Sequence, residues 1–269
     1  MPTVNANGIN IYYEVHGEGQ PLLLITGLSY THWAWHRMVP YLAENFQVIV
    51  FDNRGAGQTD KPEGPYNVEM MAADTAGLLE ALGIEQAAAM GHSLGGFVAQ
   101  ALVLARPELV SKLILAGTSF GGPNAVPITP EALAVLTDPS IDSAELTRRG
   151  LHIATAPGFA ERNPAFVEKW LAHRTQKPMA PEHYQAQLAV SLALASEEAA
   201  FEKHLPQLAT PTLLLFGEHD KLMPPGNAEL LAEKIPNSTV VILPDAGHQF
   251  PLEIPEEAAR AVTTFLTAS

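Results

Sequence analysis

The segment Gly91-His92-Ser93-Leu94-Gly95-Gly96 decides the fold of this chain. It follows the short apolar run from Ala87 to Met90 and precedes a stretch with helical character from Phe97 to Ala105. A serine at a sharp turn between a strand and a helix needs small neighbours, and the flanking glycines supply them. The first turn of the helix also leaves backbone N–H groups free to meet a developing anion. The segment therefore predicts a serine hydroxyl that is presented as a nucleophile.

Apolar runs on both sides of this segment predict a mostly parallel sheet. Continuous apolar runs suit strands that are covered on both faces, whereas the loose alternation of residues 9–15 suits a half-buried antiparallel strand. The buried strands are expected at residues 21–26, 46–51, 87–90, 112–116, 212–216 and 239–243. Helices are expected at residues 33–43, 68–82, 97–105, 226–235 and 255–268. This alternation predicts an α/β fold, with Asn67 and Gly83 bounding the second helix.

Between residues 121 and 205 the pattern changes to helices without strands. Proline stands at an expected first helical position in Thr129-Pro130-Glu131, Asn163-Pro164 and Ala180-Pro181-Glu182. We therefore predict a core formed by residues 1–120 and 206–269. Residues 121–205 are expected to be inserted as a helical cap over one edge of the sheet.

An acid and a histidine follow the last two expected strands. A serine hydroxyl is a weak nucleophile and needs a base that a third group orients. Asp220 follows the first of these strands and His248 follows the second. Together with Ser93 they lie just past the carboxyl ends of strands, where open α/β sheets bind ligands. Glu218 is the nearest rival for the role of the acid, and Asp245 is interpreted as a turn residue.

Backbone N–H groups are expected to bind the oxyanion that forms when a serine attacks an acyl carbon. One donor should be Leu94, the residue after the nucleophile. The other should be Leu28, in the loop after the strand at 21–26, where Gly27 allows the backbone to turn inward. His92 is interpreted as structural, because the sharp turn directs consecutive side chains apart.

Four motifs in this order resemble those of the α/β-hydrolase superfamily, and the resemblance runs along nearly the whole chain. They are the G-x-S-x-G segment around Ser93, the D-x-R-G-x-G-x-S/T loop in Phe51-Asp52-Asn53-Arg54-Gly55-Ala56-Gly57-Gln58-Thr59, the acid loop Gly217-Glu218-His219-Asp220 and the histidine loop Gly247-His248. The resemblance implies an eight-stranded, mostly parallel sheet with a helical cap above a triad of Ser93, Asp220 and His248.

Two loops need separate comment. Many relatives carry His-Gly before the second oxyanion donor, whereas this chain has Thr26-Gly27. That histidine usually supports the loop, so we expect the oxyanion site to persist without it. Asp52 and Arg54 are interpreted as a charged turn that props the loop beneath the site.

The serine itself narrows the reaction. The superfamily's haloalkane dehalogenases and epoxide hydrolases carry aspartate at that position. In its length and its modest cap, the chain is similar to 3-oxoadipate enol-lactonases, acyl-homoserine lactonases and small bacterial carboxylesterases. This implies hydrolysis of a small to medium apolar ester or lactone through an acyl-enzyme. The substrate pocket is expected to include Phe120, Met223, Phe250, Leu133 and Trp170.

Three alternatives remain open. A cofactor-free perhydrolase or haloperoxidase uses the same triad with peroxide as the acceptor, and a carbon–carbon bond hydrolase uses it on a ketone. Outside the enzymes, a ligand receptor can keep the hydrolase fold and turn over very slowly. Turnover of an activated ester discriminates the receptor from the enzymes.

Composition excludes several other classes. Fifteen basic and 29 acidic side chains give a net charge of −14, which disfavours nucleic acid and anionic membranes as partners. The chain lacks cysteine, which excludes disulfides and a thiolate nucleophile. No phosphate-binding, dinucleotide or metal-ligand motif stands out, so we expect no cofactor and no metal. The first residues lack the pattern of a signal peptide, so the cytoplasm is the expected location.

Overall fold

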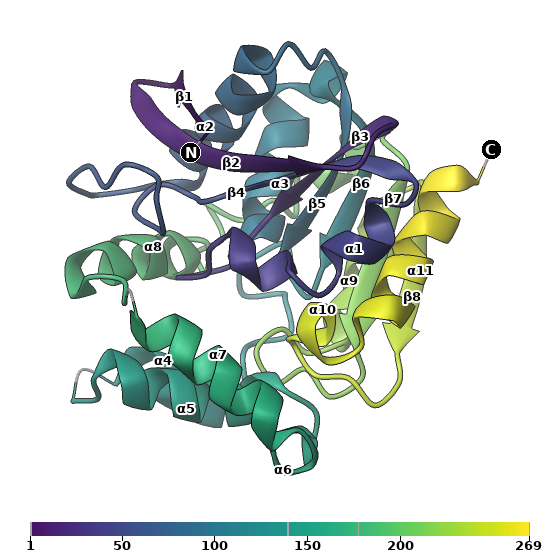
Figure 1. The fold of residues 1–269 in the computed structure, drawn as a ribbon. Coiled ribbons are helices and arrows are strands. Elements are labelled where there is room, and N and C mark those ends of the chain that lie inside the picture. The colour runs from purple at the N-terminus through teal and green to yellow at the C-terminus, as the bar shows by residue number, and fades with distance from the viewer. Residues whose placement is uncertain (1, 139, 177, 269) are drawn as a thin grey trace.

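The computed structural model describes residues 2–138, 140–176 and 178–268 and contains one sheet of eight strands (Figure 1). The strands span Thr3–Ala6 (β1), Ile9–His16 (β2), Gln20–Ile25 (β3), Phe46–Phe51 (β4), Ala87–His92 (β5), Val110–Ala116 (β6), Thr212–Gly217 (β7) and Ser238–Leu243 (β8). Their order is β1-β2-β4-β3-β5-β6-β7-β8. Among the described strands, the pairs β1–β2 and β2–β4 are antiparallel and the other five pairs are parallel. The predicted eight-stranded, mostly parallel sheet is confirmed.

The central strands are buried because helices cover both faces of the sheet. All six residues of β5 are buried, and the side chains from Leu22 to Ile25 in β3 are 0 % exposed. At the edge, β8 exposes Val240 and Ile242. Continuous apolar runs therefore predicted the inner strands well. The short strand β1 lacks such a run and was not predicted.

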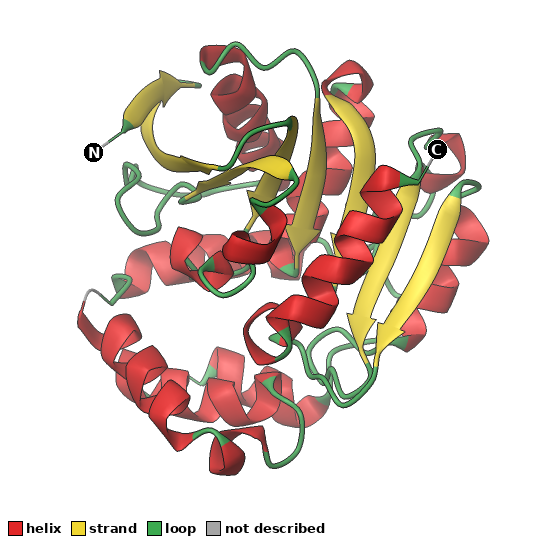
Figure 2. Ribbon diagram, turned by 45° about the vertical axis from the view of Figure 1, so that its right-hand side comes forward, coloured by secondary structure: helices red, strands yellow, loops and turns green. Residues whose placement is uncertain are grey.

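Different helices cover the two faces. Val68–Ala81 (α2), Leu94–Ala105 (α3) and Gly226–Lys234 (α9) contribute buried side chains to one core. Val39–Leu42 (α1) and Pro255–Thr267 (α11) contribute to the core on the opposite face. Figure 2 shows α11 running along β7 and β8. Each fully buried valine, leucine, isoleucine, phenylalanine or methionine stabilises this arrangement by about 1.5–3 kcal/mol relative to exposure.

The predicted limits of α2 are close to those observed. Asn67 is its N-cap, and its side-chain oxygen accepts a hydrogen bond of 2.8 Å from the backbone N–H of Met70. Gly83 follows the helix with φ +69°. An amide or hydroxyl cap at the start and a glycine beyond the end are sequence signals with a direct steric and hydrogen-bonding cause.

A single helix over residues 33–43 is a wrong prediction. The structure has a 3₁₀ turn at His32–Trp35 (η1) and the separate short helix α1. Pro40 lies in the first turn of α1. A proline in the interior of a continuous helix removes a backbone hydrogen bond and clashes with the preceding turn, so the chain starts a new helix here instead.

Among the described residues, five α-helices lie between β6 and β7. They are Pro130–Thr137 (α4), Ser143–Ala154 (α5), Phe159–Arg162 (α6), Pro164–Gln176 (α7) and Pro181–Ala193 (α8). We call residues 121–205 the insertion. In Figure 2 these helices lie beyond the arrowheads of the parallel strands, at the edge where the strands end. Proline begins three of them, as expected, whereas α5 begins after Asp142, whose side chain accepts a hydrogen bond from Glu145 N–H.

Three short elements complete the chain, at Pro107–Leu109 (η2), Leu205–Gln207 (η3) and Phe250–Glu253 (α10). Over the described residues, no helix combines the length and the apolar character that crossing a bilayer requires.

Candidate active site

Ser93 sits at the turn between β5 and α3 in a strained backbone conformation. Its φ and ψ are 56° and −121°, in a region that residues with a side chain rarely occupy. The backbone N–H of Ser93 donates to Ala116 O at 3.0 Å, and its carbonyl oxygen accepts from Gly96 N and from the Thr118 hydroxyl, each at 2.9 Å. These bonds anchor the turn on β6 and α3. The strain is therefore held by the neighbouring strand and helix.

The glycines around Ser93 are required by close backbone contacts. A Cβ atom on Gly91 would lie 2.1 Å from Gly95 O, and one on Gly95 would lie 2.2 Å from Ile25 O. No side chain fits at either position without moving the backbone. The sequence pattern G-x-S-x-G thus reflects how tightly α3 packs against β5 and β3.

Asp220 and His248 form a buried pair past the ends of β7 and β8. His248 Nδ1 donates to Asp220 Oδ2 at 2.7 Å, and the two residues are 2 % and 3 % exposed. The other carboxylate oxygen of Asp220 accepts 2.8 Å bonds from the backbone N–H groups of Leu222 and Met223. With Nδ1 engaged, Nε2 is the ring nitrogen left for a further partner. Ser93 and His248 line the same cavity.

The rival acids lie elsewhere. Glu218 is exposed, and its Oε2 atom accepts from the backbone N–H of Asp245 at 3.2 Å. Asp245 has φ +54°, which fits its interpretation as a turn residue. The histidine pairs with Asp220 and with neither rival.

His92 holds the backbone of His248 in place through a hydrogen bond. Its Nε2 atom donates to His248 O at 2.8 Å, and the two rings lie 4.5 Å apart between centroids. Burial, followed by the proximity of His248, holds the pKa of His92 well below its usual range, so the ring is neutral. A neutral ring can donate from Nε2 without adding a charge beside His248. His92 thus supports the pair structurally.

Glu253 is a buried acid that the sequence analysis missed. Its two carboxylate oxygens accept from Ala156 N at 2.7 Å and from Gly247 N at 3.0 Å. Burial raises its pKa to about 7. The side chain therefore joins the insertion to the loop that carries His248. It belongs to the short helix α10, and no motif marks it.

The loop after β3 runs directly against Ser93. A Cβ atom on Gly27 would lie 3.0 Å from Ser93 Cβ and 3.5 Å from its Oγ. Leu28 lines the cavity, while Leu94 begins α3, where the first N–H groups have no partner within the helix. The segments that carry the two backbone groups expected to bind an oxyanion thus lie next to the serine.

A cavity of about 420 Å³ lies between the insertion and the strand ends. Its wall includes Ser93, His248, Met223 and Arg174. Most other lining side chains are apolar, and those from the insertion include Leu133, Leu136, Leu146, Ile153, Leu188 and Leu192. The volume falls in the range of small-molecule sites. Arg174 was not anticipated as a lining residue.

Three of the five side chains predicted for the pocket pack into cores instead. Phe120 is 0 % exposed and belongs to the core beside α2, α3 and α9, where Lys234 Nζ lies 5.2 Å from its ring centroid. Phe250 is fully buried on the opposite face of the sheet, edge-on to His92. Trp170 packs with Leu151 and Leu252. Position near a strand end does not fix the direction of a side chain, and burial of a large ring favours the cores.

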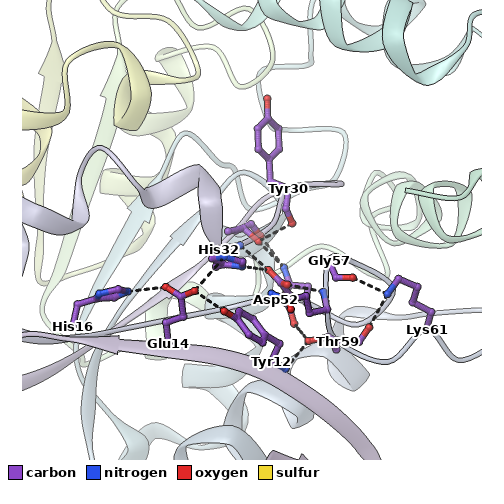
Figure 3. A network of polar contacts seen from close by, with 12 residues as sticks. Tyr12, Glu14, His16, Tyr30, His32, Asp52, Gly57, Thr59 and Lys61 are labelled. Atoms are coloured by element: carbon purple, nitrogen blue, oxygen red, sulfur yellow. Dashed lines mark hydrogen bonds and ion pairs between the residues drawn. The ribbon is translucent and has the colours of Figure 1, made fainter. Parts of the chain in front are cut away.

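Asp52 organises a polar network beside the site (Figure 3). Its Oδ1 atom accepts from the backbone N–H and from Nδ1 of His32 at 2.7 and 2.8 Å, and its Oδ2 accepts from Gln58 N at 2.8 Å. Arg54 instead pairs with buried Asp74 through two bonds of 2.5 and 2.6 Å. Both side chains hold loops in place, in keeping with their structural interpretation.

One exposed group of residues has the composition of a metal site. Glu218, His219 and Asp245 each bring one potential ligand atom within 4.8 Å of the others. All three are exposed, and exposed acidic groups are common on protein surfaces without a bound ion. The group lies outside the wall of the cavity.

Comparison with known proteins places these features in a family. The family described as "alpha/beta hydrolase fold" matches residues 20–255. The chain is 30 % identical to a 3-oxoadipate enol-lactonase from Acinetobacter baylyi, over 97 % of this chain and 94 % of the relative. A thermophilic esterase from Thermogutta terrifontis is 29 % identical with a TM-score of 0.82, covering 99 % and 98 %. A meta-cleavage product hydrolase from Pseudomonas fluorescens is 25 % identical with a TM-score of 0.84, covering 99 % and 97 %.

Proposed function

The chain belongs to the α/β-hydrolase family, and from this premise we propose that it is a serine hydrolase that cleaves carboxylic esters or lactones of small to medium apolar acyl compounds. One observation carries the proposal. A serine with positive φ and a buried Asp220–His248 pair meet at one largely apolar cavity. The likeness to an enol-lactonase and to an esterase supports the same class of reaction.

In this mechanism Ser93 Oγ attacks the acyl carbon, and its proton passes to Nε2 of His248. Asp220 accepts the Nδ1–H bond, which leaves Nε2 as the basic nitrogen and stabilises the imidazolium that forms. The protonated ring then gives its proton to the departing alkoxide. An acyl-enzyme on Ser93 remains, and His248 activates water to release the acid and restore the serine.

The negative charge that develops on the acyl oxygen needs donors at a fixed position. We assign the backbone N–H groups of Leu94 and Leu28 to this role, because their segments flank Ser93 on two sides. Loss of one such donor typically lowers kcat by about 10²–10³-fold. The cavity wall supports an apolar acyl group, since charged side chains are few among its lining residues. The substrate is a small molecule, and a cytoplasmic location stays a prediction from the sequence.

The first test is a panel of p-nitrophenyl esters from acetate to decanoate, together with simple and acyl-homoserine lactones. We expect multiple turnovers by the wild type and a loss of kcat of at least ~10³-fold in Ser93→Ala, with the fold retained. The preferred chain length then measures how much acyl group the cavity accepts. Activity near wild type in Ser93→Ala refutes the mechanism.

A second pair of variants tests the acid. Asp220→Asn should lower kcat by about 10⁴-fold, because the amide favours the wrong tautomer of His248. Glu218→Gln is the matched control, since Glu218 is exposed and two residues away, and it should retain activity. The reverse result assigns the acid to Glu218.

The panel also separates two of the three alternatives from an esterase. Labelling of Ser93 by a fluorophosphonate without turnover of any ester or lactone indicates a carbon–carbon bond hydrolase or a ligand receptor. Cleavage of a carbon–carbon bond in a ketone substrate by the same preparation selects the former. Absence of labelling in the folded protein refutes an activated serine altogether.

A further inference from the structure

The loop from Gly27 to Tyr30 forms a tight turn beside the nucleophile. The backbone N–H of Tyr30 donates to Gly27 O at 3.3 Å, which closes a four-residue turn with Leu28 and Ser29 at its centre. Ser29, the third residue, has φ +61°. A type II turn needs positive φ at this position and strongly favours glycine there. Serine is an unusual occupant.

The conformation of Ser29 is costly on its own. A left-handed backbone costs a residue with a Cβ atom about 1–2 kcal/mol and persists only where the surroundings impose it. Left to its own preference, a serine at the third position takes negative φ, as in a type I turn. That change rotates the peptide between Leu28 and Ser29, so that Leu28 O and Ser29 N–H exchange directions and the support of Leu28 beside Ser93 changes. The turn therefore has two arrangements, and its surroundings select one.

Two side chains of the insertion select the arrangement of the turn in which Ser29 has positive φ. Gln187 in α8 accepts the backbone N–H of Ser29 through Oε1 at 2.9 Å. Arg174 in α7 donates to Ser29 O at 2.6 Å and to its hydroxyl at 2.8 Å. The N–H, the carbonyl oxygen and the hydroxyl of Ser29 are thus all bound by these two side chains. Gln187 lies 158 residues and Arg174 lies 145 residues further along the chain.

Both side chains are themselves fixed. Gln187 is 0 % exposed, and its Nε2 atom donates to Arg54 O at 2.8 Å. The Arg174 guanidinium carbon lies 4.4 Å from the centroid of the Tyr30 ring. A buried amide with both ends bonded cannot rotate without losing about 1–3 kcal/mol per unpaired group. This is enough to offset the strain at Ser29.

We propose that Gln187 and Arg174 are positioning residues that hold the Gly27–Tyr30 turn in its strained form, with Leu28 N–H set to bind the oxyanion. The inference rests on the proposed function. Catalytic competence then depends on α7 and α8 being seated on the core, because the insertion supplies both contacts. The contacts act on the transition state, so their loss lowers kcat and leaves KM nearly unchanged.

The test compares Gln187→Met with Gln185→Met, the same substitution at an exposed position of the same helix. We expect Gln187→Met to lower kcat by about 10–100-fold, less than complete loss of an oxyanion donor, while KM changes less than about 3-fold. Gln185→Met should match the wild type. A rise in KM at unchanged kcat, or equal activity of the two variants, overturns the proposal.

A rescue distinguishes positioning from general damage. Glycine adopts positive φ without strain, so Ser29→Gly makes the turn less dependent on the insertion. The loss of kcat caused by Gln187→Met should therefore be several-fold smaller in the Ser29→Gly background than in the wild type. A loss of the same size in both backgrounds contradicts the inference.

Two further measurements keep the outcomes separate. If Gln187→Met does not fold, Arg174→Met is judged by its loss of kcat and by the size of that loss in the Ser29→Gly background, because Arg174 lines the cavity and can also change KM. Exposed Arg149→Met is its control. Ser93-dependent turnover by the wild type is established first. If that is absent, the proposed function fails, and the turn is judged by the rate of fluorophosphonate labelling, because the phosphoryl oxygen occupies the same anion site. An unchanged labelling rate in Gln187→Met then refutes the positioning role.

Discussion

Replacing Glu253 by glutamine should alter how stability depends on pH. Glu253 is 7 % exposed, and its carboxyl group accepts two backbone N–H bonds, from Ala156 and Gly247. Burial is the largest cause of its raised pKa, with backbone donors opposing it. Glutamine is close in size but cannot ionise. It also turns an NH₂ group toward one of two N–H donors, which costs about 1–3 kcal/mol at any pH.

The magnitude follows from the pKa. The pKa of Glu253 is about 7 in the folded protein, against 4.5 for an unperturbed glutamate. Between pH 4.5 and pH 7 the unfolded chain binds fewer protons than the folded protein. The contribution of Glu253 to the free energy of unfolding is therefore fully present below about pH 4.5 and is lost as the pH rises through 7. At about 1.4 kcal/mol per pKa unit, the whole range corresponds to about 3 kcal/mol. From pH 5.5 to 8 it corresponds to about 2 kcal/mol.

Urea unfolding of wild type and Glu253→Gln at half-unit steps from pH 5.5 to 8 measures the effect. The lower limit stays above the isoelectric point of about 5.1, where solubility is lowest. Taking the difference between the two proteins cancels the titration of other groups. The wild-type advantage should shrink by about 2 kcal/mol as pH rises. A constant difference, or an advantage that grows with pH, refutes the argument from burial.

Two further predictions concern buried polar contacts. His92→Phe keeps a ring of similar size but leaves His248 O without its donor. The free energy of unfolding should therefore fall by about 1–3 kcal/mol and kcat by roughly 10-fold. Unchanged thermal unfolding and unchanged kinetics would contradict the supporting role of His92. Asp74→Ala leaves the Arg54 guanidinium buried without its carboxylate, and the free energy of unfolding measured in urea should fall by about 3–5 kcal/mol. A loss below about 1 kcal/mol would show that water readily replaces the carboxylate.

Local steric rules explain which parts of the fold and site were predictable from sequence. Gly91 and Gly95 permit backbone contacts that no other residue allows, so the turn at Ser93 has a readable pattern. Asn67 and Gly83 mark their helix for similar reasons. Chain order then placed the acid and the histidine past the last two strands. Each of these signals lies within a few residues of the feature it predicts.

Features that depend on packing between distant segments were missed or wrongly placed. Phe120 and Phe250 flank strand ends, yet their rings turn into the two cores, because the direction of a side chain depends on what surrounds it. Glu253 meets Ala156 across 97 residues of sequence, and Gln187 meets Ser29 across 158. No short pattern encodes such contacts, and only the folded arrangement reveals them.

The interrupted sheet also has a consequence for biosynthesis. Because β7 and β8 follow the insertion, the ribosome releases the segments that carry Asp220 and His248 long after Ser93 has been made. Until β7 is available, the outer edge of β6 lacks its partner, and residues 113–116 of that strand are wholly apolar. An unpaired apolar edge is a site for aggregation. Chains that stall within the insertion should therefore depend on chaperones, and any activity that requires His248 can appear only after β8 has been made.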